Sequence, residues 1–335
     1  MDDPTGRFWS SAGGLFNLLN DYVPVIDGTA SAKGGNMIEK VAYGGWPDCY
    51  RVSDGKWELI VVSDVGPRAI RFGFVGGDNV FCEFEELLGL SGGSEWRVYG
   101  GHRLWHSPEA MPRSYIPDNK PADVVVEGGE LRVIQPLETE TGIRKEMLFA
   151  LAQGRLTVTH VLRNRGVWPV TLAPWALSVM APGGMGIIPQ PTTHHPDNLL
   201  PNRTLALWPY TDMSDERLRW GARYISMRQD TSAGPAKIGL NADDGWLAYL
   251  NKDLLFVKRF NYQPCCGYPD GGCSVEMYTN ERMLELETLG PLTSLEPGES
   301  VKHVERWYLF ADVTLEDESE EAIDQAVRSR ATSVE

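Results

Sequence analysis

The stretch KWELIVVSDVGPRAIRFGFVGGDNVF, residues 56–81, decides the fold class. Two runs rich in β-branched and aromatic residues are separated by Gly66-Pro67, and the second run ends at Gly76-Gly77. Such residues favour strands, while glycine and proline mark the turns between them. The stretch therefore predicts two short strands joined by a turn.

The same pattern recurs along the chain. ADVVVEGGELRVIQP (122–136) predicts a hairpin that turns at Gly128-Gly129, and GIRKEMLFALAQGRLTVTHVLRNRG (142–166) predicts another that turns at Gln153-Gly154. Only DESEEAIDQAVRSRA (317–331) is helical in pattern, with acidic residues in its first turn and arginine in its last. Many strands and one short C-terminal helix predict an all-β sandwich of antiparallel strands.

The chain has 335 residues, enough for one large all-β domain. Residues 1–36 are rich in Gly, Ser, Ala and Asp, and regular patterning begins at Met37. We see neither a repeat of fixed period nor a linker after that point. The sequence predicts a loosely ordered N-terminal leader, residues 1–36, and a single domain, residues 37–335. An N-terminal arm that packs on the domain is the alternative for the leader.

Composition and charge narrow the partners. The net charge is −15 and no basic run is present, which argues against nucleic acid. No apolar run reaches the ~18 residues of a membrane span, and the N-terminus lacks the pattern of a secretory signal, so we expect a cytoplasmic protein that does not bind membranes. A small-molecule partner fits best, whereas the oligomeric state is not indicated.

The five cysteines predict neither a disulfide framework nor a metal site. Their number is odd and their spacing uneven, which suits reduced thiols. The cluster CCGYPDGGC (265–273) lacks the paired C-x-x-C spacing of zinc sites. We therefore predict no metal and no cofactor.

The segment YGGHRLWHSPEAMPRSY, residues 99–115, is the first candidate site. It places His102, Arg103, Trp105 and His106 behind two glycines, which combines hydrogen-bonding groups with an aromatic face, as a sugar site requires. A solvated surface loop is the alternative. Elsewhere, His160 in LTVTHVLRN (156–164) is interpreted as a core residue. The pair His194-His195 is left open between a cleft and solvent.

Carboxylates on two late strands form the second candidate site. In RMLELETLGPL (282–292), Glu285 and Glu287 alternate with leucines and so share one face of a strand. In GCSVEMYTN (272–280), Glu276, Tyr278 and Asn280 give a neighbouring strand a matching polar face. Two such strands predict a polar concave surface that binds sugars and holds a general base. A purely solvent-exposed face is the alternative.

Taken in order, several segments resemble the galactose mutarotase-like superfamily, which includes the aldose 1-epimerases. The resemblance covers most of residues 40–312 and rests on LIVVSDVGPRAIRFGFVGGDNVF (59–81), GGHRLW (100–105), LTVTHVLRNRGVWPVTLAPWALSVMAPGG (156–184) and MLELETLGPLTSLEPGESVKHVERWYL (283–309). More narrowly, GGHRLWHSPE (100–109), LLPNRTLALWPY (199–210) and YPDGGCSVEMYTN (268–280) are similar to an uncharacterised bacterial branch, the DUF4380 family.

This resemblance implies a β-supersandwich and an aldose 1-epimerase-like isomerase acting on a carbohydrate. In mutarotases a late-strand glutamate takes the proton of the anomeric hydroxyl and a histidine protonates the ring oxygen. The LET motif assigns the glutamate role to Glu287, whereas the segment PVTLAPW (169–175) places Trp175 where the histidine is expected. His102 or His106 would then supply the acid. The alternatives are a sugar-binding or sensing module without catalysis, and a glycoside-cleaving enzyme that uses Glu276 and Glu287.

The sequence thus yields two sets of candidate residues. The catalytic candidates are Glu287, His102, His106 and Glu276, and the substrate-binding candidates are Arg103, Trp105, Trp175, Lys258, Tyr278 and Asn280.

Overall fold

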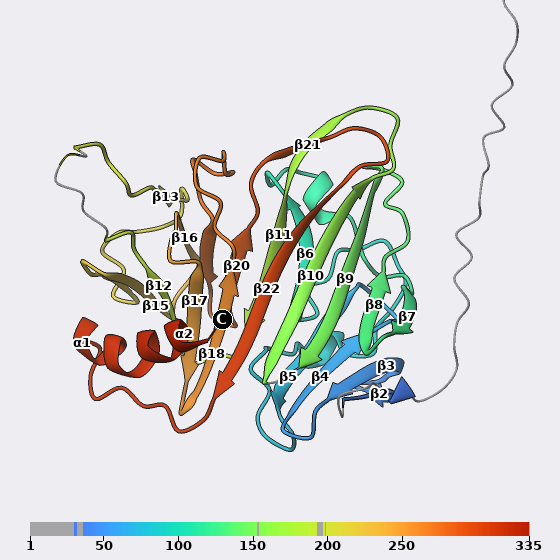
Figure 1. Cartoon of the computed structure of the whole chain (residues 1–335), viewed down its shortest axis with the longest axis horizontal. Coiled ribbons are helices and arrows are strands. Elements are labelled where there is room, and N and C mark those ends of the chain that lie inside the picture. Colours follow the sequence, from blue (N-terminus) through green and yellow to red (C-terminus); the bar gives the residue numbers. More distant parts are fainter. Residues whose placement is uncertain (1–29, 32–35, 153, 193–196, 198, 335) are drawn as a thin grey trace, which may run out of the picture.

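Two antiparallel sheets face each other and enclose the core in the computed structural model (Figure 1). The structure describes residues 30–31, 36–152, 154–192, 197 and 199–334. The larger sheet contains, in spatial order, β1 (Ala30–Ser31), β2 (Met37–Tyr43), β3 (Trp46–Ser53), β4 (Trp57–Val62), β5 (Arg68–Phe74), β6 (Gly101–Ser107), β11 (Val170–Met180), β20 (Leu284–Leu289), β19 (Val275–Thr279), β16 (Ala236–Leu240) and β13 (Leu205–Leu207), with β21 (Thr293–Leu295) paired to β11.

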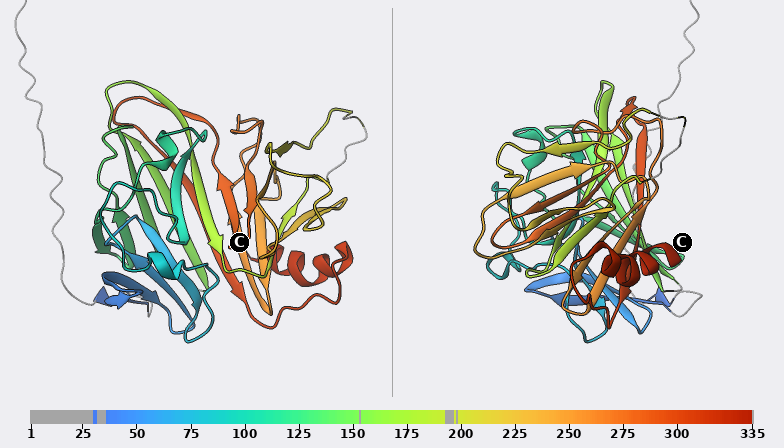
Figure 2. Two further views of the ribbon diagram at one scale, coloured as in Figure 1. Left: turned by 180° about the vertical axis from the view of Figure 1, so that it is seen from behind. Right: turned by 90° about the vertical axis from the view of Figure 1, so that its left-hand side faces the viewer.

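The smaller sheet lies against the inner face of the larger one (Figure 2). Its spatial order is β14 (Leu218–Trp220), β15 (Tyr224–Arg228), β12 (Met185–Pro189), β17 (Trp246–Asn251), β18 (Leu254–Phe260), β22 (Ser300–Phe310), β10 (Arg155–Asn164), β9 (Ile143–Ala152), β8 (Glu130–Ile134) and β7 (Asp123–Glu127). The predicted all-β sandwich is confirmed, as are the two strands around Gly66-Pro67 and the hairpin at Gly128-Gly129.

The core forms where the inward-facing side chains of the two sheets meet. Phe72 on β5 lies with its ring centroid 6.1 Å from that of Phe256 on β18 and 5.6 Å from that of Trp307 on β22. Since strand side chains alternate between faces, each strand of the larger sheet gives one face to this core and the other face to the outside. The outward face of β6, β11, β20, β19 and β16 is therefore free to form a site.

Two consecutive glycines let β6 begin close to neighbouring backbone. Gly100 has φ +101° and a Cβ there would lie 2.0 Å from the carbonyl oxygen of Cys82, while Gly101 has φ +70° and a Cβ would lie 2.3 Å from that of Ala69. Only glycine tolerates both the positive φ and the close approach. The pair therefore sets the start of β6 and, with it, the faces of the residues that follow.

The C-terminal helix is confirmed and packs with one apolar stripe on the protein. α1 (Glu320–Ile323) and α2 (Ser329–Ser333) are joined by a π-helical turn over Asp324–Arg328. Ser319 caps the N-terminus by accepting a hydrogen bond from the amide of Ala322 at 3.2 Å. Ile323, Val327 and Ala331, four residues apart, are buried in the core.

Most of the predicted leader, residues 1–36, lies outside the described residues. The exceptions are Asn36 and β1, whose Ala30 and Ser31 pair with Ile38 and Met37 of β2. Within the described part of the chain, no helix has both the length and the apolar character required to cross a membrane.

Candidate functional site

Side chains from five adjacent strands line the outward face of the larger sheet. Arg103 on β6 pairs with Leu177 on β11, which pairs with Glu287 on β20, and Glu287 pairs with Glu276 on β19. One pleat away, Glu285 pairs with Tyr278. Residues two apart on a strand share a face, so the strand pattern that alternates glutamate with leucine brings these polar groups together.

This face is hollowed into two adjoining lobes. The first lobe has a volume of about 520 Å³ and the second about 370 Å³. Trp96, Arg103, Trp105, Tyr278, Asn280 and Glu285 line the first lobe, Met111, Trp208, Asp270 and Glu276 line the second, and Glu109, Tyr115 and Trp175 line both. We call the two lobes together the cleft.

An aromatic wall bounds the first lobe. The rings of Trp105 and Trp175 lie 5.2 Å apart, and Tyr115 lies 5.2 Å from Trp105 and 5.4 Å from Trp96. All these pairs are edge-to-face or tilted, which is the favourable geometry for aromatic contacts. The wall therefore offers a fixed apolar surface beside polar groups.

Arg103 and Glu285 form the polar floor of the first lobe. The guanidinium of Arg103 stacks on Trp105 at 4.2 Å and on Trp96 at 5.0 Å, and its Nη2 lies 3.3 Å from Oε1 of Glu285. Its Nε and Nη1 are buried without a hydrogen-bond partner among the described residues. Burial raises the pKa of Glu285 to about 7, against the opposing effect of Arg103. The first lobe thus contains free donors and a carboxyl group that titrates near neutral pH.

Lys237 on β16 joins the two other carboxylates. Its Nζ lies 2.7 Å from Oε2 of Glu276 and 3.1 Å from Oε2 of Glu287, while Nε1 of Trp175 donates to the same Glu287 oxygen at 2.6 Å. Burial alone would lower the pKa of Lys237, but the two glutamates outweigh it and raise that pKa well above its usual value. Burial also raises the pKa of Glu276. The ammonium thus lies between the two carboxylates that a glycosidase reaction would require.

His102 and Lys258 do not lie in the cleft, contrary to expectation. Both are fully buried, and both point into the space between the sheets. GGHRLW is part of strand β6 and not a loop, so with Arg103 facing the cleft, His102 must face the core. Lys258 belongs to β18 of the other sheet, where its Nζ lies 2.9 Å from Oε1 of Glu305. Neither side chain reaches the carboxylates of the outward face.

His106 is displaced for the same reason. It lies on the same face of β6 as His102 and is 2% exposed, with Nε2 3.7 Å from Oε2 of Glu138. Every histidine that the structure describes, namely His102, His106, His160 and His303, therefore faces away from the cleft. The predicted core position of His160 is confirmed, and His194-His195 lie outside the described residues.

The interior histidines belong to a closed hydrogen-bond network. Nδ1 of His160 lies 3.1 Å from the carbonyl oxygen of His303, so it carries the proton and leaves Nε2 as an acceptor. His102 donates to that atom from its Nε2 at 2.7 Å and accepts at Nδ1 from the hydroxyl of Ser178 at 2.8 Å. Burial lowers the pKa of both imidazoles, which favours these neutral forms.

The same network contains a geometric candidate for a metal site. Ligand atoms of His102, His160 and Glu305 lie within 4.8 Å of one another. Yet both carboxylate oxygens of Glu305 already have partners. Oε1 pairs with Lys258 and Thr288, and Oε2 accepts a hydrogen bond from Nε1 of Trp307. Each candidate ligand atom has a partner, and the ammonium of Lys258 lies beside them. These residues are therefore better suited to a hydrogen-bonded network in the core than to binding a metal cation.

Among the predicted binding residues, Arg103, Trp105, Trp175, Tyr278 and Asn280 all line the cleft. Glu276 lines its second lobe, and Glu287 lies beneath it. Sequence reasoning missed three groups: Lys237, Trp96 and Trp208. A lysine within the apolar strand AKIGL (236–240) is a signal that it needs a buried partner, but the partner's identity is not visible in the sequence.

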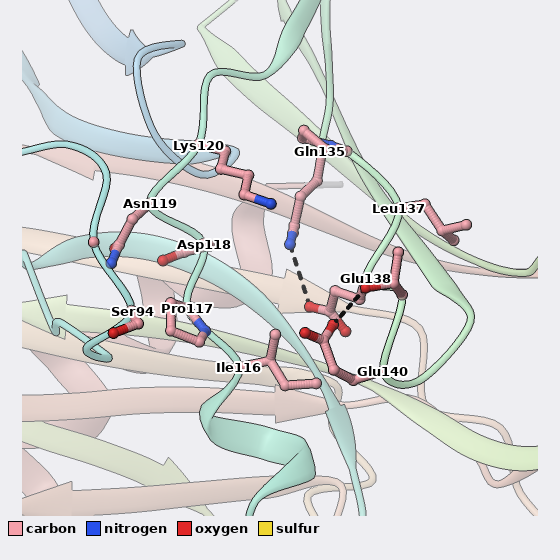
Figure 3. A pocket seen from close by; sticks show the side chains of 13 residues that line it. Ser94, Ile116, Pro117, Asp118, Asn119, Lys120, Gln135, Leu137, Glu138 and Glu140 are labelled. Carbon is pink, nitrogen blue, oxygen red and sulfur yellow. Dashed lines mark hydrogen bonds between the residues drawn. The ribbon is translucent and has the colours of Figure 1, made fainter.

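A separate cavity of about 300 Å³ lies beside the sandwich near Lys120 and Gln135 (Figure 3). Its buried carboxylate, Glu138, accepts a hydrogen bond from Nε2 of Gln135 at 3.2 Å and forms a salt bridge with Lys145. The described lining of this cavity contains no aromatic ring. Because this cavity lacks an aromatic surface and its Glu138 is already paired, the cleft is the stronger candidate site.

Several solved structures share this architecture. A galactose mutarotase-like protein from Lactobacillus casei aligns with a TM-score of 0.52 and 9% identity over 78% of this chain and 100% of its own. A galactose mutarotase-like protein from Clostridium acetobutylicum aligns with a TM-score of 0.50 and 13% identity over 82% and 98%. A candidate aldose 1-epimerase from Escherichia coli K12 gives 0.53 and 13% over 78% and 99%.

No family model matches the sequence, and no curated protein matches it significantly. The narrower resemblance to the DUF4380 family therefore stays a prediction. The identities to the solved structures are low, so they bear on architecture and not on activity. On that evidence, the chain has the galactose mutarotase-like fold.

Proposed function

We propose that this protein binds a carbohydrate in the cleft and interconverts its anomers, as an aldose 1-epimerase does. The observation that carries the proposal is the first lobe. Aromatic rings of Trp96, Trp105 and Tyr115 adjoin the unpartnered donors of Arg103 and the carboxyl of Glu285. Sugars present an apolar ring face and a rim of hydroxyls, and this surface complements both.

Anomer exchange requires one group that accepts a proton from the anomeric hydroxyl and another that donates one to the ring oxygen. Glu287 is proposed as the acceptor. Trp175 and Lys237 donate to its Oε2, while its Oε1 has no hydrogen-bond partner among the described residues. The free oxygen is the atom that would take the proton.

Glu285 is proposed as the donor in place of a histidine. Because its pKa is raised to about 7, a substantial fraction carries a proton at neutral pH. Glu285 and Glu287 lie two residues apart on one face of β20, about 7 Å along the strand. A pyranose in the first lobe would contact Glu285 and exchange a proton with Glu287, which lies beneath the cleft. The ring opens when the proton leaves one oxygen and another proton reaches the ring oxygen, and it recloses after rotation about the C1–C2 bond.

The experiment is NMR measurement of anomer exchange on freshly dissolved aldoses, with the parent protein and the variants Glu285→Gln and Glu287→Gln. We expect one sugar to exchange faster with the parent and both variants to lose at least about 100-fold of the acceleration. Glu281→Gln, on an exposed turn, is the matched control. Full acceleration in both carboxylate variants would contradict the assigned roles.

A binding module without catalysis is the second candidate. The supporting observation is that every described histidine faces the interior and that Trp175 occupies the position expected for the acid. In that case saturation-transfer NMR detects sugar binding while anomer exchange proceeds at the uncatalysed rate. The same samples therefore discriminate between the two functions.

A further inference from the structure

We propose that the cleft takes a saccharide of at least two rings, with one ring in each lobe. This inference rests on the proposed carbohydrate function and specifies its ligand class. The inference begins from the observation that the second lobe is a separate space and not the edge of the first. Each lobe has a volume of its own, about 520 Å³ and about 370 Å³, and each falls within the ~300–1,000 Å³ range of ligand pockets.

Each lobe has its own aromatic surface. Trp96 and Trp105 line the first lobe only, whereas Trp208 lines the second only. Trp208 is half-buried, and the ammonium of Lys237 lies 4.7 Å from its ring centroid. That cation–π contact favours this position of the ring, which helps to preorganise Trp208 as a stacking surface.

Each lobe also has its own unpartnered buried polar group, and the two groups differ in kind. In the first lobe, Nε and Nη1 of Arg103 are donors without acceptors. In the second lobe, Oε1 of Glu276 is an acceptor without a donor among the described residues, and the side chain is fully buried. A buried polar group without a partner costs about 1–3 kcal/mol, so both are expected to be satisfied by a ligand.

The boundary between the lobes suits a glycosidic linkage. Glu109, Tyr115 and Trp175 line both lobes, so the two lobes adjoin at these residues. Trp175 is held there by its hydrogen bond to Glu287 and by the Lys237 ammonium 4.7 Å from its ring centroid. A single pyranose in the first lobe leaves Glu276 and Trp208 uncontacted, whereas a second ring reaches both.

The test is calorimetric titration of matched saccharide pairs with the full chain. Glucose is compared with cellobiose and with maltose, and galactose with lactose. For at least one pair we expect the disaccharide to bind at least about tenfold more tightly than its monosaccharide. Trp208→Ala should weaken the disaccharide at least about fivefold more than the monosaccharide, Trp208→Phe should restore most of the loss, and Trp96→Ala should weaken both sugars.

Trp168→Ala is the matched control, because Trp168 is 78% exposed and lines neither lobe. Equal affinity within every pair, together with no selective effect of Trp208→Ala, would overturn the two-ring proposal while leaving sugar binding in place. If no saccharide of the panel binds at all, the proposed function and this inference both fail. Circular dichroism of each variant ensures that a lost affinity does not reflect lost folding.

Discussion

The indole Nε1 of Trp175 donates a 2.6 Å hydrogen bond to Oε2 of Glu287. The residue that stands where a mutarotase histidine is expected is thus bound to the proposed base. The indole N–H is too weak an acid to protonate a sugar, but it can donate a hydrogen bond to a carboxylate. We therefore expect this position to support the proposed base.

Replacing Trp175 by Phe should impair the proposed base without emptying the cleft. The variant keeps an aromatic ring near Lys237 but removes the hydrogen bond to Glu287. Losing a donor to a charged acceptor costs about 1.5–3 kcal/mol, which is expected to slow anomer exchange about 10- to 100-fold. The exchange rate at saturating sugar is the measurement, and a rate identical to the parent would contradict this support.

Glu285 should make the folded protein less stable as pH rises from about 4.5 to 7. Its pKa is raised to about 7 by burial, so the folded state retains a proton that the unfolded state releases at lower pH. The sign follows directly, because stability falls with pH wherever the folded state binds more protons. Glu285→Gln should remove this slope, at most about 1.4 kcal/mol per pH unit.

The measurement for Glu285 is the urea midpoint at half-unit intervals of pH for parent and variant. The difference between them isolates Glu285 from other titrating groups. Glu281→Gln, at an exposed position, serves as the control and should leave the slope unchanged. A constant difference across this range would show that Glu285 titrates elsewhere.

Lys237→Met should destabilise the protein by about 3–5 kcal/mol, because it leaves Glu276 and Glu287 buried without their shared ammonium. Adding Glu276→Gln should recover a large part of the loss, since one buried charge is then removed. Urea denaturation of the two single variants and the double variant gives the coupling energy. Additive effects would mean that Lys237 and Glu276 do not interact in solution.

Lys258→Met tests whether this lysine supports the fold or binds substrate. In the structure its ammonium forms an ion pair with Glu305. It also donates to the carbonyl oxygen of Leu286 at 3.2 Å, and Leu286 lies between Glu285 and Glu287 in the sequence of β20. We expect a loss of about 3–5 kcal/mol of stability. At temperatures where the variant is still folded, its saccharide affinity should match that of the parent. A selective loss of affinity would reinstate Lys258 as a binding residue.

The interior histidines should produce a loss of stability in acid. Burial lowers the pKa of His102, His160 and His303, the last to about 3. A lowered pKa contributes stability above the unfolded value of about 6.5 and loses it as pH falls toward the folded value. His303→Gln should therefore reduce the slope of stability against pH below 6.5, by at most about 1.4 kcal/mol per unit. An unchanged slope would show that His303 is charged in the folded protein.

The sequence by itself determined the class of fold and much of the outward face. Alternation of glutamate with leucine placed Glu285 and Glu287 on one side of a strand, and the same period placed Glu276 beside Tyr278. These are local consequences of strand geometry, in which residues two apart share a face. The β-rich runs around Gly66-Pro67 and the C-terminal helix were also visible, because each is a local pattern of residues.

Only the tertiary structure decided which side chains meet. His102 and Arg103 face opposite sides of the sheet because their segment pairs with β5 and β11 as strand β6 and does not form a loop. Lys258 is in the other sheet. Lys237 reaches Glu276 and Glu287 because β16 pairs with β19, which places Gly239 opposite Glu276. Such contacts depend on long-range strand pairing, which the local period of a sequence does not encode.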